Sequence, residues 1–161
     1  MATIKLTHDF KEFLHLLNSE KIEYLLIGGY AVALYGYVRP TKDMDVWIST
    51  RPENIDRLIA VLIRFGFAAD QIKKERFAGP QTVFRMGVPP NRLEILTAIS
   101  GVNFEQCFPR RTTLEIDGIR VPVIAYDDLK QNKSASDRLS DRADVERLEK
   151  ARMRREKRAN P

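Results

Sequence analysis

LLIGGYAVALYGYVRPTKDMDVWI, residues 25–48, is the stretch that decides the fold. Residues 24–27 form an uninterrupted apolar run, which is typical of a strand covered on both faces. Gly28 and Gly29 follow at once and indicate a tight turn into a short helix. A second apolar strand is predicted over residues 44–49. Two strands and a helix within so few residues indicate a layered α/β unit.

Two acidic residues, Asp43 and Asp45, begin the second strand. Because strand side chains alternate, both carboxylates project from one face of the sheet. Adjacent carboxylates repel unless a cation lies between them, and Mg²⁺ is the default cation for oxygen ligands, with Mn²⁺ able to replace it. The alternative is an ordinary exposed strand end, because such a short motif recurs by chance.

Three further features favour a phosphate and metal site. Without a Cβ, Gly28 and Gly29 let backbone N–H groups approach a phosphate closely. Glu94 is an acid between apolar neighbours in the predicted strand RLEILT, where it must face a polar rim or bind something. A cationic run before the two aspartates can neutralise phosphate charge or pair with the carboxylates; it consists of Arg39, Thr41 and Lys42.

The remaining periodicities interleave helices with strands, which predicts one α/β (α+β) domain with a mixed sheet flanked by helices and with C-terminal helices. We expect this domain to span residues 1–146 and a basic helical tail to span residues 147–161. Asp117 and Gly118 mark a hairpin between two strands. Helices are expected over 8–21, 30–35, 52–65, 126–134 and from 140, and strands over 24–27, 44–49, 83–86, 93–97, 112–116 and 119–124.

Composition excludes several classes. With 161 residues and 43% hydrophobic content the chain can build its own core. One cysteine, Cys107, and two histidines cannot make a disulfide or a structural zinc site, and a reducing cytoplasmic setting is the simplest interpretation. No apolar run reaches the roughly 20 residues of a membrane span. The net charge of +5 is concentrated in residues 147–161, which fits either nucleic-acid contact or a solvated helix end.

The order of these motifs resembles the nucleotidyltransferase superfamily of DNA polymerase β. Within it, GGYAVALYGYVRPTKDMDVWI is most similar to small bacterial nucleotidyltransferases related to AbiEii-type toxins. The segment VIAYDDLKQNKSASDRLSDRADVERLE resembles the C-terminal part of that branch, where one helix carries a lysine and the next carries D-x-x-D. The resemblance covers about residues 22–149.

The resemblance implies a Mg²⁺-dependent enzyme that transfers a nucleoside monophosphate from an NTP to a hydroxyl of RNA, a protein or a small molecule. It also implies a role in a toxin–antitoxin or phage-defence system, with a cognate antitoxin or another protein as partner. It assigns the phosphates to Gly28, Gly29 and Lys133, and the metals to Asp43, Asp45 and Glu94. Gly29 stands where many members have serine, and Glu94 where this branch often has aspartate.

Two alternatives stay open at this stage. One is a catalytically weak nucleotide- or RNA-binding module with the same fold. The other is a surface ion network in which the acids pair with Arg39, Lys42 and Arg92, and such a network would show no saturable metal effect on the melting temperature.

Overall fold

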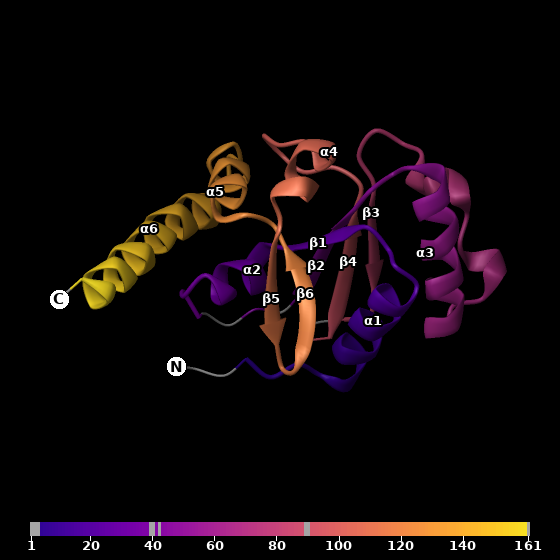
Figure 1. Cartoon of the computed structure of the whole chain (residues 1–161). Helices are drawn as coiled ribbons and strands as arrows, with labels where there is room; N and C mark the ends of the chain where they lie inside the picture. Colours follow the sequence, from indigo (N-terminus) through magenta and orange to yellow (C-terminus); the bar gives the residue numbers. More distant parts are fainter. Residues whose placement is uncertain (1–3, 39–40, 42, 89–90, 161) are drawn as a thin grey trace.

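The computed structural model describes residues 4–38, 41, 43–88 and 91–160. These residues form a mixed six-stranded sheet in the order β3-β4-β2-β1-β6-β5 (Figure 1). The strands are β1 (Tyr24–Ile27), β2 (Asp43–Ile48), β3 (Val83–Met86), β4 (Arg92–Leu96), β5 (Thr112–Ile116) and β6 (Ile119–Val123). The helices are α1 (His8–Ser19), α2 (Gly28–Leu34), α3 (Pro52–Phe65), α4 (Phe104–Cys107), α5 (Tyr126–Ser134) and α6 (Leu139–Ala159), with short 3₁₀ segments at Ala69–Gln71, Lys74–Phe77 and Phe108–Arg110.

The sheet mixes both strand orientations. β1 runs antiparallel to β2 and parallel to β6, while β2 runs parallel to β4. The hairpins β3–β4 and β5–β6 are antiparallel. The predicted mixed sheet flanked by helices is therefore confirmed. Pro89 and Pro90, predicted to turn the β3–β4 hairpin, lie outside the described residues.

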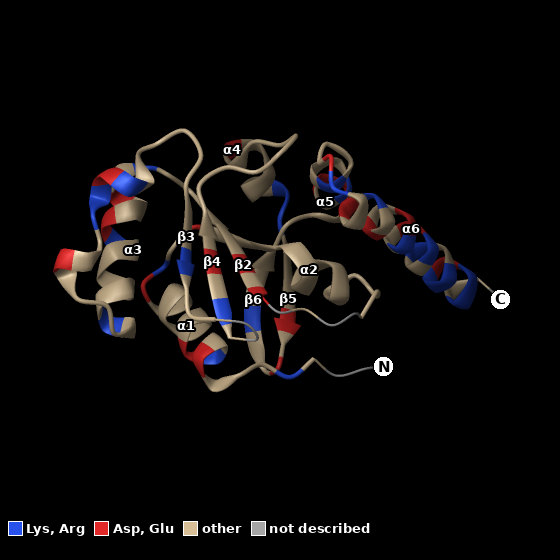
Figure 2. Cartoon of the chain, turned by 180° about the vertical axis from the view of Figure 1, so that it is seen from behind, with Lys and Arg blue, Asp and Glu red and all other residues tan. Residues whose placement is uncertain are grey.

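The two faces of β2 have different roles. Met44, Val46 and Ile48 are buried on one face, whereas Asp43 and Asp45 project from the other. Figures 1 and 2 show α1 and α3 covering one face of the sheet and α2 lying on the opposite face. The short α2 leaves part of its face uncovered, so the acidic side chains of β2 can reach a pocket.

Local signals fix several element ends as the sequence predicts. The Thr7 side chain accepts a hydrogen bond from the Phe10 N–H at 3.2 Å and caps α1. Gly66 ends α3 with a φ of 125°. Asp117 and Gly118 both have positive φ, 47° and 82°, as a two-residue hairpin turn requires.

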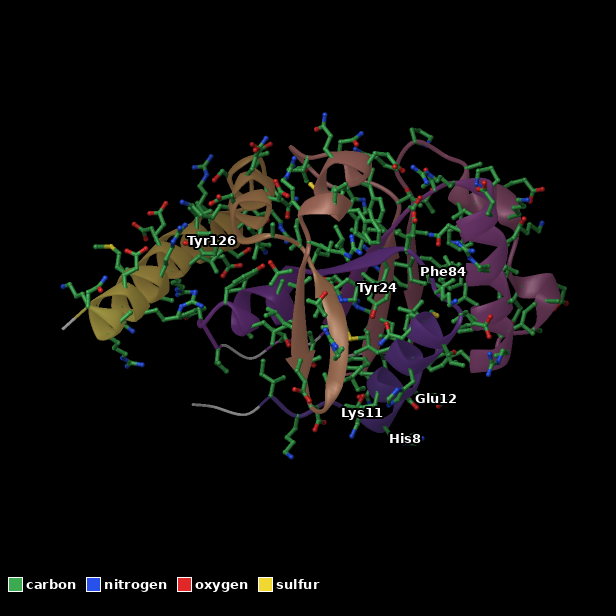
Figure 3. All side chains as sticks on the ribbon, viewed as in Figure 1. His8, Lys11, Glu12, Tyr24, Phe84 and Tyr126 are labelled. Atoms are coloured by element: carbon green, nitrogen blue, oxygen red, sulfur yellow. The ribbon has the colours of Figure 1, made fainter. Side chains whose placement is uncertain are left out.

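The first helix carries an exposed polar side, visible in Figure 3 around His8, Lys11 and Glu12. His8 Nε2 lies 3.9 Å from Glu12 Oε2, and the histidine side chain is 91% exposed. These residues form the surface of α1 and stand apart from the acids of β2.

The C-terminal helices α5 and α6 pack together, and α6 extends away from the sheet (Figure 1). α6 runs without a break through residues 146 and 147, and Figure 2 shows basic residues along its length. Its far half is not detached, because Arg155 Nη2 donates to the Tyr35 carbonyl at 2.7 Å and Arg147 stacks over the Tyr37 ring. No helix in the described part of the chain is long and apolar enough to cross a membrane.

Candidate active site

The pairing of β2 with its neighbours gathers the predicted acids into one row. Asp43 lies opposite Arg92, and Asp45 lies opposite Glu94, in the parallel β2–β4 register. Across the β3–β4 hairpin, Arg85 is the register partner of Glu94. Cross-strand partners have their side chains on the same face, so three carboxylates and two guanidinium groups share one patch. Figure 2 shows the acidic and basic residues side by side on these strands.

Arginines hold two of the three acids. Arg92 donates to both oxygens of Asp43, at 3.0 Å from Nε and 2.7 Å from Nη2. Arg85 Nε donates to Glu94 Oε1 at 2.9 Å, and Arg92 Nε lies 3.5 Å from the same oxygen. The described residues contain no group of three acidic, histidine or cysteine side chains arranged to hold a metal ion as they stand. The ion network predicted as an alternative is thus present for Arg92.

Asp45 differs from the other two acids because no arginine binds it. Its Oδ1 is buried and has no hydrogen-bond partner among the described residues. Burial, a hydrogen bond with Glu94 and the negative charges of Glu94 and Asp43 raise the pKa of Asp45 to about 7, against a smaller opposing effect of Lys133. A cation at this position would remove the cause of that shift.

The glycine turn is shaped around Asp45. Gly28 has a φ of +69°, and a Cβ there would overlap Asp45 Oδ2 and come within 3.2 Å of its Cγ. A side chain at position 28 is therefore excluded by both backbone conformation and space. The glycine lets the backbone at the start of α2 lie directly against the carboxylate.

Lys133 is more buried than its predicted role suggests. It is 5% exposed, and its Nζ lies 2.8 Å from Asp141 Oδ1 and 3.2 Å from Asp144 Oδ2. Burial acts to raise the pKa of Asp141, but hydrogen bonds from Arg138, Lys133 and Ser136 outweigh it and lower that pKa below its ordinary value. Lys133 lines the pocket and at the same time joins α5 to α6.

A pocket of about 610 Å³ opens over the row of acids. Its lining contains seven of the nine residues predicted from the sequence, namely Gly28, Gly29, Thr41, Asp43, Asp45, Glu94 and Lys133. The other two, Arg39 and Lys42, lie outside the described residues. Further lining residues come from β3, β4 and the α5–α6 connection: Gln81, Val83, Arg85, Arg92, Leu96, Ala98, Ile99, Ser100, Asn132, Ser136, Arg138, Ser140 and Asp141, together with Ile27 from β1.

Two arginines of this pocket were not among the predicted site residues. Arg85 could have been found, because the alternation of VFRM puts it on the outward face beside Val83. Arg138 gives no such signal, since it stands in the connection before α6 and meets Asp141 through tertiary packing, at 3.0 Å from Nε to Oδ2. Trp47, expected to be core or pocket wall, is core: it is 1% exposed and packs edge-on against Phe104.

A mixed sheet with a glycine turn and three acids on adjacent strands defines the nucleotidyltransferase class of fold, and solved structures of that class share it. One is the lincosamide antibiotic adenylyltransferase LnuA with lincomycin bound, at a TM-score of 0.56 and 16% identity over 91% of this chain and 98% of that one. Another is a Thermotoga maritima protein described as a nucleotidyltransferase, at 0.56 and 16% over 94% and 91%. A third is ANT(2")-Ia in complex with adenylyl-2"-tobramycin, at 0.51 and 15% over 86% and 84%. At these identities the likeness establishes the fold.

The family follows from the sequence itself. Residues 9–153 match the model of the aminoglycoside-2''-adenylyltransferase family, and the chain belongs to that family. It is therefore a nucleotidyltransferase. No curated protein matches the chain in sequence. The superfamily predicted from the sequence is confirmed, while the AbiEii-type branch within it stays a prediction.

Proposed function

We propose that this chain transfers AMP from ATP to a hydroxyl group of a small molecule. Membership of an adenylyltransferase family supports the nucleotide and the type of reaction. The observation that carries the proposal for this chain is the row of Asp43, Asp45 and Glu94, placed beside the Gly28 turn within one pocket. A nucleotide needs such a pairing of carboxylates and close backbone approach.

The residues fit a divalent metal ion, for which Mg²⁺ is our proposal. Three carboxylates supply hard oxygen donors, and Asp45 Oδ1 is a buried acceptor without a partner among the described residues. Asp43 and Glu94 would have to exchange arginine for metal. When bound, the metal would neutralise triphosphate charge and make the acceptor hydroxyl easier to ionise.

The other residues of the pocket have distinct tasks in this proposal. The backbone at Gly28 and Gly29 contacts the phosphates, and Thr41 offers a hydroxyl beside them. The acceptor oxygen forms a bond to the α-phosphorus while the bond from that phosphorus to the bridging oxygen of pyrophosphate breaks. Glu94 takes the acceptor proton. Arg85 and Arg92, released from the carboxylates, neutralise charge that develops on the leaving pyrophosphate.

The proposal requires that label from α-labelled ATP appear on a hydroxylated small molecule, with Mg²⁺ or Mn²⁺ present. Lincomycin, tobramycin and total RNA serve as acceptors, so that the RNA acceptor predicted from the sequence is tested alongside. Asp45→Asn should abolish transfer, and Asp70→Asn, at an exposed position outside the pocket, should not. Label on RNA alone, or equal label with both variants, would contradict the proposal.

A further inference from the structure

We infer that the acceptor is a hydroxylated molecule without a cluster of positive charges, such as a neutral glycoside, and not a polyamine. The inference rests on the proposed function and concerns the acceptor of that same site. It follows from the distribution of charge over the pocket lining, which differs between the row of acids and the rest of the wall.

The described lining contains four acids, and three of them belong to the row proposed to bind metal. The fourth, Asp141, is held by Lys133 at 2.8 Å and by Arg138 at 3.0 Å. None of the four is available to an ammonium group of a ligand. The residues outside the described ranges add no carboxylate, because they are Met, Ala, Thr, Arg, Lys and Pro.

Metal binding would make the pocket more positive toward the acceptor. If the metal occupies Asp43, Asp45 and Glu94, then Arg85 and Arg92 lose their carboxylate partners. The triphosphate can take up such cations, as it does at many phosphate sites. A polycationic acceptor would meet these arginines with no acid left to balance them, and like charges at close range are unfavourable.

The part of the pocket beyond Glu94 is uncharged except for Arg85. It lies over the edge strand β3 and the end of β4, on the other side of the acids from the glycine turn. Its remaining side chains are apolar or carry hydroxyl and amide groups, which can pack on a ring and donate or accept single hydrogen bonds. They are Gln81, Val83, Leu96, Ala98, Ile99 and Ser100.

A polyamine acceptor requires the opposite lining. Each ammonium group buried in a pocket needs a carboxylate or several acceptors to replace its water. The family description names an aminoglycoside, a class that carries several amines. The described pocket of this chain lacks the acids that such a molecule would need.

A matched pair of acceptors tests the inference. Tobramycin and its fully N-acetylated derivative share a carbohydrate skeleton and hydroxyl groups but differ in charge. Binding of each is measured by calorimetry to the full chain, saturated with Mg²⁺ and α,β-methylene ATP. We expect the acetylated form to bind about tenfold more tightly or better.

The outcomes separate the inference from the proposed function. Tighter binding of tobramycin, weakening as salt rises, would overturn the inference and leave the proposed function intact. Binding of the nucleotide with neither acceptor form would reject both this inference and the small-molecule acceptor. Failure to bind the nucleotide would remove the proposed function and the inference with it.

A matched pair of variants locates the acceptor wall. Val83→Glu places a carboxylate on the lining of β3, and Val88→Glu makes the same charge change at a position that is 74% exposed and outside the lining. We expect Val83→Glu to raise tobramycin affinity about tenfold and Val88→Glu to leave it unchanged. Equal effects of the two variants would show that this wall does not contact the acceptor.

Discussion

Arg92 holds both carboxylate oxygens of Asp43, at 3.0 Å and 2.7 Å, across the parallel pair β2–β4. The two residues are register partners, so the backbone places them opposite one another before any ligand arrives. A planar guanidinium and a carboxylate in this fork geometry make one of the stronger pairings between side chains. A metal ion that uses Asp43 must therefore compete with Arg92.

Arg92→Gln should increase affinity for Mn²⁺ in the absence of nucleotide by about tenfold, because it removes that competitor and leaves Asp43 available. The loss of the free Mn²⁺ signal in electron paramagnetic resonance measures the dissociation constant. Arg51→Gln is the control, since Arg51 pairs with the exposed Glu105. Equal affinity in the wild type and in Arg92→Gln would contradict the competition.

Asp45→Asn should stabilise the metal-free protein at alkaline pH. The pKa of Asp45 rises from 3.8 to about 7 on folding, so between these values the unfolded state loses a proton that the folded state keeps. The free energy of unfolding of the wild type therefore falls with rising pH in this window, relative to the asparagine variant. Urea denaturation at about pH 5 and about pH 8 should show a relative loss of about 2 kcal/mol. A difference that does not change with pH would refute the assignment.

Gly28→Ala should destabilise the protein more than Gly118→Ala does. Both glycines have a positive φ, +69° and +82°, but only a Cβ at position 28 would collide with Asp45, whereas position 118 faces open space. We expect about 1 kcal/mol for Gly118→Ala from backbone strain and about 3 kcal/mol for Gly28→Ala, because the Asp45 carboxylate must also move. Thermal denaturation measures both, and equal losses would argue against the close contact.

Lys133→Met should lower the free energy of unfolding by about 3 to 5 kcal/mol, because it removes a buried cation from Asp141 and Asp144. Lys130→Met is the matched control: Lys130 pairs with Glu149 at the surface, and such a pair contributes at most about 1 kcal/mol. Chemical denaturation of the two variants gives the comparison. A small, equal effect of both would mean that Lys133 does not hold α5 and α6 together.

Local sequence patterns predicted the elements and part of the site. Alternation along DMDVWI was enough to put Asp43 and Asp45 on one face, and the apolar neighbours of Glu94 were enough to place it in a strand. The pairing of β2 with β4 brings Asp45 and Glu94 together, and neither strand's own periodicity determines it. Strand pairing depends on side-chain packing between residues far apart in the chain, which a local pattern does not contain.

The sequence was least informative about Lys133 and Arg138. The segment YDDLKQNKS is polar on most positions and indicates a solvated helix, yet α6 covers Lys133 and leaves it 5% exposed. Its carboxylate partners follow it by 8 and 11 positions, so the cluster forms only when α5 and α6 pack. Burial of a charge by a second helix has no local signal.

The alternation of β2 also constrains how this strand can evolve. Met44, Val46 and Ile48 fill the core, while Asp43 and Asp45 face the pocket, so the same six residues serve the hydrophobic core and the site. A deletion or insertion of one residue inside the strand would exchange the faces, exposing three core side chains and burying two carboxylates at once. Length changes in this part of the chain are therefore expected to accumulate in the loops on either side of β2.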